Sequence, residues 1–165
     1  MRLRPAIAIA ALSVVGAASV AAAAPPAKLD MIDFFTGRTH GENTLNQPFV
    51  GPTPLIVDSV GRKDGNEFVM IDTVREGKKP VRTRKWVMRE SGPNHYKGTL
   101  TDATGPVDIA VGGNGAVIRY TMKGGLKIEQ VLELQPSGRA LKSTVIARKF
   151  GMRFATATGT IRKLD

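Results

Sequence analysis

The segment 116–134 alternates apolar and polar residues on both sides of a glycine pair. Apart from the glycine, its even-numbered positions are apolar except for Gln130, whereas Arg, Lys, Thr and Glu take most of the odd positions. A period of two is typical of a strand with one buried face. We therefore predict a hairpin whose even-numbered side chains, Tyr120 and Gln130 among them, share the apolar face.

The length of the hairpin loop follows from this pattern, because directly opposed residues point to the same face of a sheet. A two-residue glycine turn would oppose Lys123 to Leu126 and mix the faces. A three-residue loop over 123–125 opposes Met122 to Leu126 instead and keeps the apolar faces together. We predict this loop, with a glycine bulge.

Short runs rich in Val, Ile, Thr and aromatic residues continue from residue 38 to the end of the chain, and no run between them is long enough for a helix. This succession of short strand-like runs predicts an all-β antiparallel meander, which would close into a barrel or split into a sandwich. The turn signals that separate the runs are Pro48–Pro54, Lys63–Asn66, Glu76–Pro80, Ser91–Asn94, Thr104–Pro106, Gly112–Gly115, Gly124–Gly125 and Pro136–Gly138.

The segments 67–75 and 80–90 carry apolar residues on both faces, so alternation alone leaves their orientation open. A loop centred on Lys78 would pair the two segments as a hairpin. In that register Met70 opposes Trp86, and the even-numbered positions hold the bulkiest apolar side chains. We predict that the even-numbered face is the interior.

An acid–base pair shares this predicted interior face, because the same register opposes Asp72 to Arg84. Arg82 lies on the same face, two residues before Arg84. We therefore expect Asp72, Arg84 and Arg82 inside the barrel beside Trp86.

The N-terminal segment has the order of a secretory signal peptide. It begins with two arginines, continues with an apolar run too short to span a bilayer, and ends in four alanines before Pro25. A buried helix is the alternative, but such a helix should show polar positions at a period of 3.6 residues, and this run shows none. We predict a signal peptide over 1–23, with cleavage after Ala22 or Ala23. No cysteine follows, so the protein is expected to be periplasmic, soluble and not lipid-anchored.

Apolar residues at 31, 32, 34 and 35, followed by Gly37, predict one or two helical turns with a glycine C-cap. The expected organisation is a signal peptide (1–23), a linker (24–28) and one β-barrel domain (29–165).

Composition limits the chemistry and the partners. The 165 residues include no cysteine, which excludes disulfides, a cysteine nucleophile and thiolate metal sites. The net charge of +10 is compatible with nucleic acid, an anionic membrane surface or an acidic ligand. Export and the lack of an aromatic-basic motif argue against nucleic acid. A basic surface that serves only solubility remains an alternative.

No catalytic constellation is visible in the sequence. The two histidines, His40 and His95, do not have a metal-ligand spacing, and no serine lies in a Gly-x-Ser-x-Gly elbow. The glycine-rich segment 112–115 is not followed by a helix or by Lys-Thr/Ser, so it predicts a turn and not a phosphate loop. We predict no metal, no cofactor and no catalytic residue.

From residue 29 to about 163 the chain resembles a family of bacterial exported proteins and lipoproteins, the domain of unknown function 3833 family. The motifs that carry the resemblance are Phe34-Phe35-Thr36-Gly37 with Gly41, Arg84-x-Trp86, Tyr96-x-Gly98 with Asp102 and Gly105, Gly113-Asn114 leading to Tyr120, and Lys149-Phe150-Gly151.

The resemblance implies a lipocalin-like β-barrel with a short N-terminal helix and an uncharacterised role. Members of this family often appear near lipid-modification enzymes. The chain departs from the family pattern in three places. It lacks the lipobox cysteine, it has Val131-Leu132-Glu133-Leu134 where an Asp-Asp-Trp segment is common, and it has Ser143-Thr144 where an Asn-Arg pair is expected.

Three functions are compatible with these observations. The first is binding of a small apolar or amphipathic anionic ligand such as a fatty acid or lipid, because a barrel of this size can hold one such molecule and arginine can bind its head group. The second is an envelope structural or interaction protein with a filled barrel, and the third is an enzyme acting on a lipid or isoprenoid through Asp72, Tyr96 or Asp102. The candidate ligand-binding residues are Asp72, Arg82, Arg84, Trp86, Tyr120 and Gln130.

Overall fold

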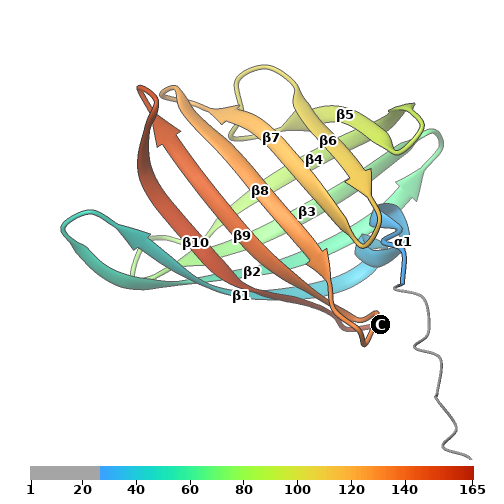
Figure 1. Ribbon diagram of the computed structural model, residues 1–165, viewed down its shortest axis with the longest axis horizontal. Coiled ribbons are helices and arrows are strands. Elements are labelled where there is room, and N and C mark those ends of the chain that lie inside the picture. The colour runs from blue at the N-terminus through green and yellow to red at the C-terminus, as the bar shows by residue number, and fades with distance from the viewer. Residues whose placement is uncertain (1–26) are drawn as a thin grey trace, which may run out of the picture.

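The computed structural model describes residues 27–165, which form a closed barrel of ten antiparallel strands preceded by one short helix (Figure 1). The predicted signal peptide, 1–23, and residues 24–26 of the predicted linker lie outside the described residues. The elements are α1 (Met31–Phe35), β1 (Gly37–Gln47), β2 (Val50–Asp64), β3 (Glu67–Glu76), β4 (Arg82–Gly92), β5 (His95–Leu100), β6 (Val107–Gly112), β7 (Gly115–Met122), β8 (Leu126–Leu134), β9 (Ala140–Lys149) and β10 (Met152–Lys163).

Each strand pairs with the next along the chain, and β1 pairs with β10 to close the sheet. The predicted meander is therefore confirmed, and it closes into a barrel and not a sandwich. Within residues 27–165, no helix has the length and apolarity needed to cross a membrane.

Both hairpin registers predicted from alternation are confirmed. Met122 opposes Leu126 across a three-residue loop. Met70 opposes Trp86 and Asp72 opposes Arg84 between β3 and β4. The even-numbered face of β3 and β4 points inward, so Asp72 is only 2% exposed.

The prediction of one long turn over Pro48–Pro54 was wrong. The chain turns only at residues 48–49, and β2 resumes at Val50. Pro54 pairs with Thr44 of β1, but β2 meets β3 only from Leu55 onward. Pro52 and Pro54 therefore lie in the part of β2 that has a partner strand on one side only, where a missing N–H is tolerated.

The predicted glycine C-cap was also wrong in detail. The helix ends at Phe35, and Thr36 caps it with extended backbone. Gly37, with φ of +89°, is instead the first residue of β1. The helix begins at the cap Asp30, whose carboxylate accepts a hydrogen bond from the Asp33 backbone N–H (2.9 Å).

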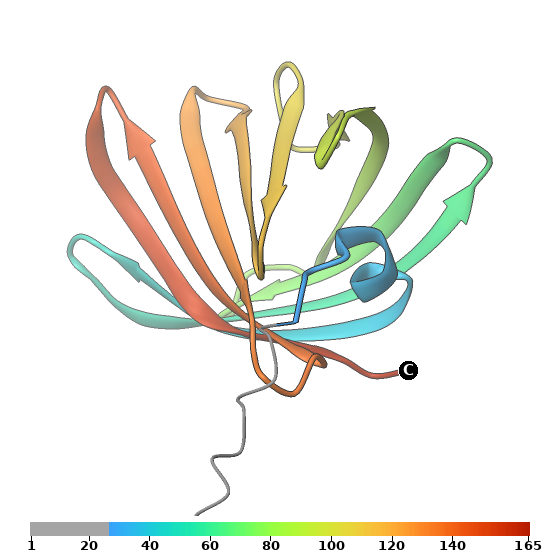
Figure 2. The same ribbon diagram turned by 45° about the vertical axis from the view of Figure 1, so that its right-hand side comes forward.

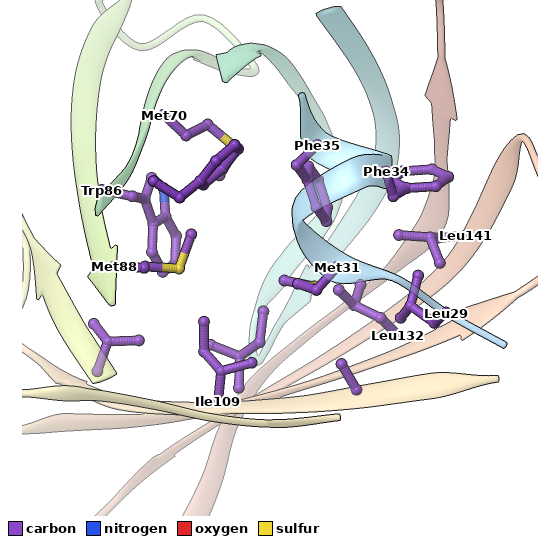
Figure 3. Close-up of a cluster of buried hydrophobic side chains, with 14 of the residues drawn as sticks. Leu29, Met31, Phe34, Phe35, Met70, Trp86, Met88, Ile109, Leu132 and Leu141 are labelled. Carbon is purple, nitrogen blue, oxygen red and sulfur yellow. The ribbon is translucent and has the colours of Figure 1, made fainter. Parts of the chain in front are cut away.

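Helix α1 covers one end of the barrel (Figure 2). It packs against Gly61 of β2, where an added Cβ would lie 2.1 Å from the Phe35 carbonyl oxygen. Met31 and Phe35 extend from α1 toward Trp86 and Met88 inside the barrel (Figure 3). We call this the closed end.

The opposite end, which we call the mouth, carries the other set of connections. Because successive strands are antiparallel, the connections 48–49, 77–81, 101–106, 123–125 and 150–151 all lie at this end.

Candidate ligand-binding cavity

A cavity of about 320 Å³ occupies the barrel between α1 and the mouth. Its two walls differ in chemistry. The β2–β4 wall carries the charged side chains Asp72, Glu76, Arg82 and Arg84. The β7–β10 wall is mainly apolar, with Met122, Leu126, Ile128, Leu132, Val145, Ala147, Phe154 and Ala155.

Asp72 is the centre of the charged wall. Its Oδ1 accepts a hydrogen bond from Ser59 Oγ (2.7 Å), and its Oδ2 accepts bonds from Trp86 Nε1 (2.8 Å) and Arg84 Nη2 (2.8 Å). The strand register explains this convergence, because Ser59, Asp72 and Arg84 form one row across β2, β3 and β4. A buried carboxylate with three donors is well compensated for the loss of water.

Arg84 keeps donors that the protein does not use. Its side chain is 15% exposed, and its buried Nε has no hydrogen-bond partner among the described residues. Burial lowers the pKa of the guanidinium, but the charge and hydrogen bond of Asp72, together with Tyr120 and Asp102, more than offset burial and hold that pKa above its usual value. Arg84 therefore stays charged, and it lies 5.7 Å from the centre of the Trp86 ring.

Tyr120 and Gln130 supply neutral polar groups from the facing wall. The Tyr120 ring packs edge-on against Trp86 with 5.7 Å between centroids. Burial raises the pKa of the Tyr120 phenol, so it stays protonated at neutral pH. Gln130 Nε2 donates a hydrogen bond to Ser143 Oγ (3.0 Å).

Arg82 lies nearer the mouth than Arg84, and its side chain is 40% exposed. Its guanidinium donates hydrogen bonds to Asp102 (2.8 Å) and Glu76 (3.5 Å). Lys79 also binds Glu76 (2.5 Å). These pairs hold Arg82 at the rim of the cavity, outside the buried cluster around Asp72.

All six residues proposed from the sequence line this one cavity. Asp72, Arg84, Trp86 and Tyr120 lie in contact, whereas Gln130 belongs to a second polar pair and Arg82 to the rim.

Sequence reasoning missed Ser59, Ser143 and Asn43, which also line the cavity. Leu55 and Val57 place the odd-numbered residues of β2 inside, so the period of two could have identified Ser59. Asn43 carries a buried Oδ1 without a partner among the described residues. Nothing in the sequence around Asn43 marks this acceptor as interior.

The arrangement can accommodate a ligand with both polar and apolar parts. A charged guanidinium faces a mainly apolar wall that also carries a phenol and an amide, and this combination can hold an oxygen-rich head group beside a hydrocarbon body. Among residues 27–165, no group of three or more His, Asp or Glu side chains is placed to hold a metal ion.

Several solved structures share this fold. The S-type phycobiliprotein lyase CpeS from Guillardia theta matches with a TM-score of 0.61 and 9% identity over 81% of this chain and 90% of the lyase. Rv2717c from M. tuberculosis matches with a TM-score of 0.61 and 12% identity, covering 80% of this chain and 94% of that protein. A protein of unknown function from the DUF3598 family of Nostoc punctiforme matches with a TM-score of 0.57 and 10% identity, covering 84% of this chain and 51% of that protein.

At these identities the likeness shows the fold alone, and the predicted class is confirmed as an all-β lipocalin-like barrel with a short N-terminal helix. No similar sequence was found among curated proteins. The family model described as "Protein of unknown function (DUF3833)" matches residues 7–163, and the chain therefore belongs to the DUF3833 family.

Proposed function

We propose that this protein is an exported, periplasmic binding protein for a small amphipathic molecule with an anionic or oxygen-rich head group, such as a fatty acid or lipid fragment. The observation that carries the proposal is the cavity, whose apolar β7–β10 wall faces the charged row on β2–β4. Its volume of about 320 Å³ is at the lower end of the range of about 300–1,000 Å³ typical of ligand pockets.

Arg84 is the residue proposed to bind the head group. Asp72 fixes its position through one Nη2 bond, which leaves other N–H donors of the guanidinium for a ligand. The hydrocarbon part of the ligand would lie against Ile128, Val145 and Ala147 on the facing wall.

A filled barrel, the structural alternative, would need side chains to occupy the space between these walls. The cavity favours binding over that alternative. The fold by itself does not distinguish the two, because function depends on the site and not on the scaffold.

The first test is native mass spectrometry of the protein purified from its own cell envelope. A co-purified lipid-sized mass supports the proposal. Repeated recovery of the apo mass only, together with no response to the ligands below, contradicts it.

The second test is a titration with decanoate and with decanol, followed through Trp86, the only tryptophan of the chain. Decanoate should bind about ten-fold more tightly than decanol, since a charge-assisted bond to Arg84 is available only to the acid. The double variant Asp72→Asn with Arg84→Met removes both charges, so neither is left buried without a partner. This variant should fold and lose the preference for decanoate over decanol. Arg89→Ala, on the outer face of β4 and paired with Glu67, is the matched control and should keep the preference. Equal binding of the two ligands by the wild-type protein would refute Arg84 as the head-group residue.

A further inference from the structure

Two phenylalanines at the mouth are exposed in positions that neither packing nor backbone preference explains. Phe49 in the β1–β2 turn is 109% exposed, and Phe150 in the β9–β10 turn is 89% exposed. Both have positive φ, 63° and 52°. A bulky side chain is rare in this conformation, where Gly, Asn or Asp is usual.

The apolar exposure is concentrated at this end of the molecule. The β1–β2 hairpin projects at the left of Figures 1 and 2, beyond the body of the barrel, and the β9–β10 turn lies at the upper left. Of the nine large hydrophobic residues exposed among residues 27–165, six lie on the mouth connections or on the strand ends beside them: Phe49, Val50, Val81, Phe150, Met152 and Phe154. Such a concentration marks an interaction surface.

The same end is basic. Lys78, Lys149 and Arg153 are exposed there and form no ion pair with any described residue. The five mouth connections contain a single acidic residue, Asp102, and Arg82 binds it. Exposed aromatic side chains thus share this end of the barrel with cations that no carboxylate neutralises, and Lys149 Nζ lies 5.7 Å from the centre of the Phe150 ring.

We propose that the mouth of the barrel docks on an anionic lipid bilayer, with Phe49 and Phe150 entering the head-group region and the surrounding cations contacting lipid phosphates. Interfacial binding combines these two features, because aromatic rings bury apolar area at the boundary while Lys and Arg attract anionic head groups. The turns present the rings at the tips of hairpins, where insertion requires no rearrangement of the sheet.

A second copy of the chain is a less suitable occupant of this surface. Two mouths facing each other would bring two sets of unpaired cations together, which opposes association. A bilayer containing phosphatidylglycerol supplies the opposite charge.

Docking in this orientation would also face the cavity toward the lipid. Phe154 and Gln47 line the cavity and lie beside the two turns. The docking proposal does not rest on the proposed function, since it depends only on surface residues.

The test is co-sedimentation of the mature protein with vesicles of phosphatidylcholine alone or of equal parts phosphatidylethanolamine and phosphatidylglycerol. Binding is expected to the anionic vesicles only, and to weaken as salt is raised. The variant Phe49→Asn with Phe150→Asn keeps residues that tolerate positive φ and should lose roughly ten-fold or more in binding. Val60→Thr with Ile71→Thr, an exposed apolar pair on the side of the barrel, is the matched control and should bind as wild type.

A charge series completes the test. Lys78→Gln, Lys149→Gln and Arg153→Gln should together weaken binding by roughly five-fold per cation, whereas Lys28→Gln, Lys63→Gln and Lys85→Gln away from the mouth should have little effect. Decanoate titration of the Phe variant without vesicles should match wild type, since neither ring lines the cavity. Three results would overturn the proposal: wild-type protein that does not bind anionic vesicles, a Phe variant that binds as well as wild type, or a wild-type dimer in sedimentation velocity that the Phe variant lacks.

Discussion

Asp72 and Arg84 face each other across β3 and β4 inside the barrel, with 2.8 Å between Oδ2 and Nη2. The carboxylate is 2% exposed and the guanidinium side chain 15% exposed, so neither charge is well screened by water. Removing one charge of such a pair costs more than removing both, because the remaining charge is left uncompensated.

Arg84→Ala should therefore lower the free energy of unfolding by about 3–5 kcal/mol. Asp72→Asn combined with Arg84→Met should recover part of this loss, since both buried charges are then absent. Urea denaturation of the two variants measures the difference. Arg89→Ala breaks an exposed pair on the same strand and should cost about 1 kcal/mol or less. An Arg84→Ala protein as stable as wild type would contradict the interior assignment of Arg84.

The close packing of α1 against β2 depends on the absence of a side chain at residue 61. Gly61→Ala would place a Cβ 2.1 Å from the Phe35 carbonyl oxygen and 2.5 Å from the Phe68 ring. The helix must then move away from β2, at a cost of about 1–3 kcal/mol, as for other overpacked sites. Gly51→Ala, whose added Cβ would meet no atom within 4 Å, is the control. Limited proteolysis should cut the N-terminal segment faster in Gly61→Ala than in wild type or Gly51→Ala. Equal cleavage rates in the three proteins would argue against close packing of α1 on β2.

His40 links stability to pH. Its hydrogen bond to Asp58 (2.6 Å between Nδ1 and Oδ1) raises the pKa of His40 above its ordinary value of 6.5. The folded state therefore holds the proton more tightly than the unfolded chain. The protonated His40 therefore contributes to the free energy of unfolding. This contribution is fully present below pH 6.5 and is lost as the pH rises through the pKa of His40 in the folded state.

The unfolding free energy of the wild-type protein should therefore fall relative to that of His40→Gln as the pH rises above 6.5. The pKa of Asp58 is lowered below 3.8 by His40 and by Arg75, so its contribution is lost at the acid end, as the pH falls through the folded pKa. Denaturation at a series of pH values measures the loss of stability at both the alkaline and the acid end. If the unfolding free energies of the two proteins changed in parallel above pH 6.5, this would contradict a stabilising pair between His40 and Asp58.

Processing of the N-terminus remains a prediction from the sequence. Cleavage after Ala22 or Ala23 should leave a mature chain that begins with Ala23 or Ala24, because a small-x-small sequence precedes each bond. Intact-mass measurement on protein from the envelope fraction reads the cleavage site directly. A mass that still includes Met1 would contradict export by this route.

The period-two pattern determined much of the barrel. Alternation assigns a face to each residue, and the loop lengths at 77–81 and 123–125 then fix the register. Asp72, Arg84 and Trp86 could be placed together in this way because they belong to two consecutive strands. The short turn at 48–49 could not be predicted in this way. Proline shows that an N–H donor is missing, but it does not show whether a neighbouring strand needs that donor.

Only the tertiary structure decided what the interior contains. Ser59 reaches Asp72 because β2 pairs in register with β3. Tyr120 meets Trp86 because the curvature of the closed sheet turns β7, three strands away from β4, toward it. The unfilled volume depends on strand number, stagger and every inward side chain at once, so no local pattern encodes it. The gathering of Phe49 and Phe150 at one end likewise follows from strand direction and closure, which bring turns about 100 residues apart in the chain to the same mouth.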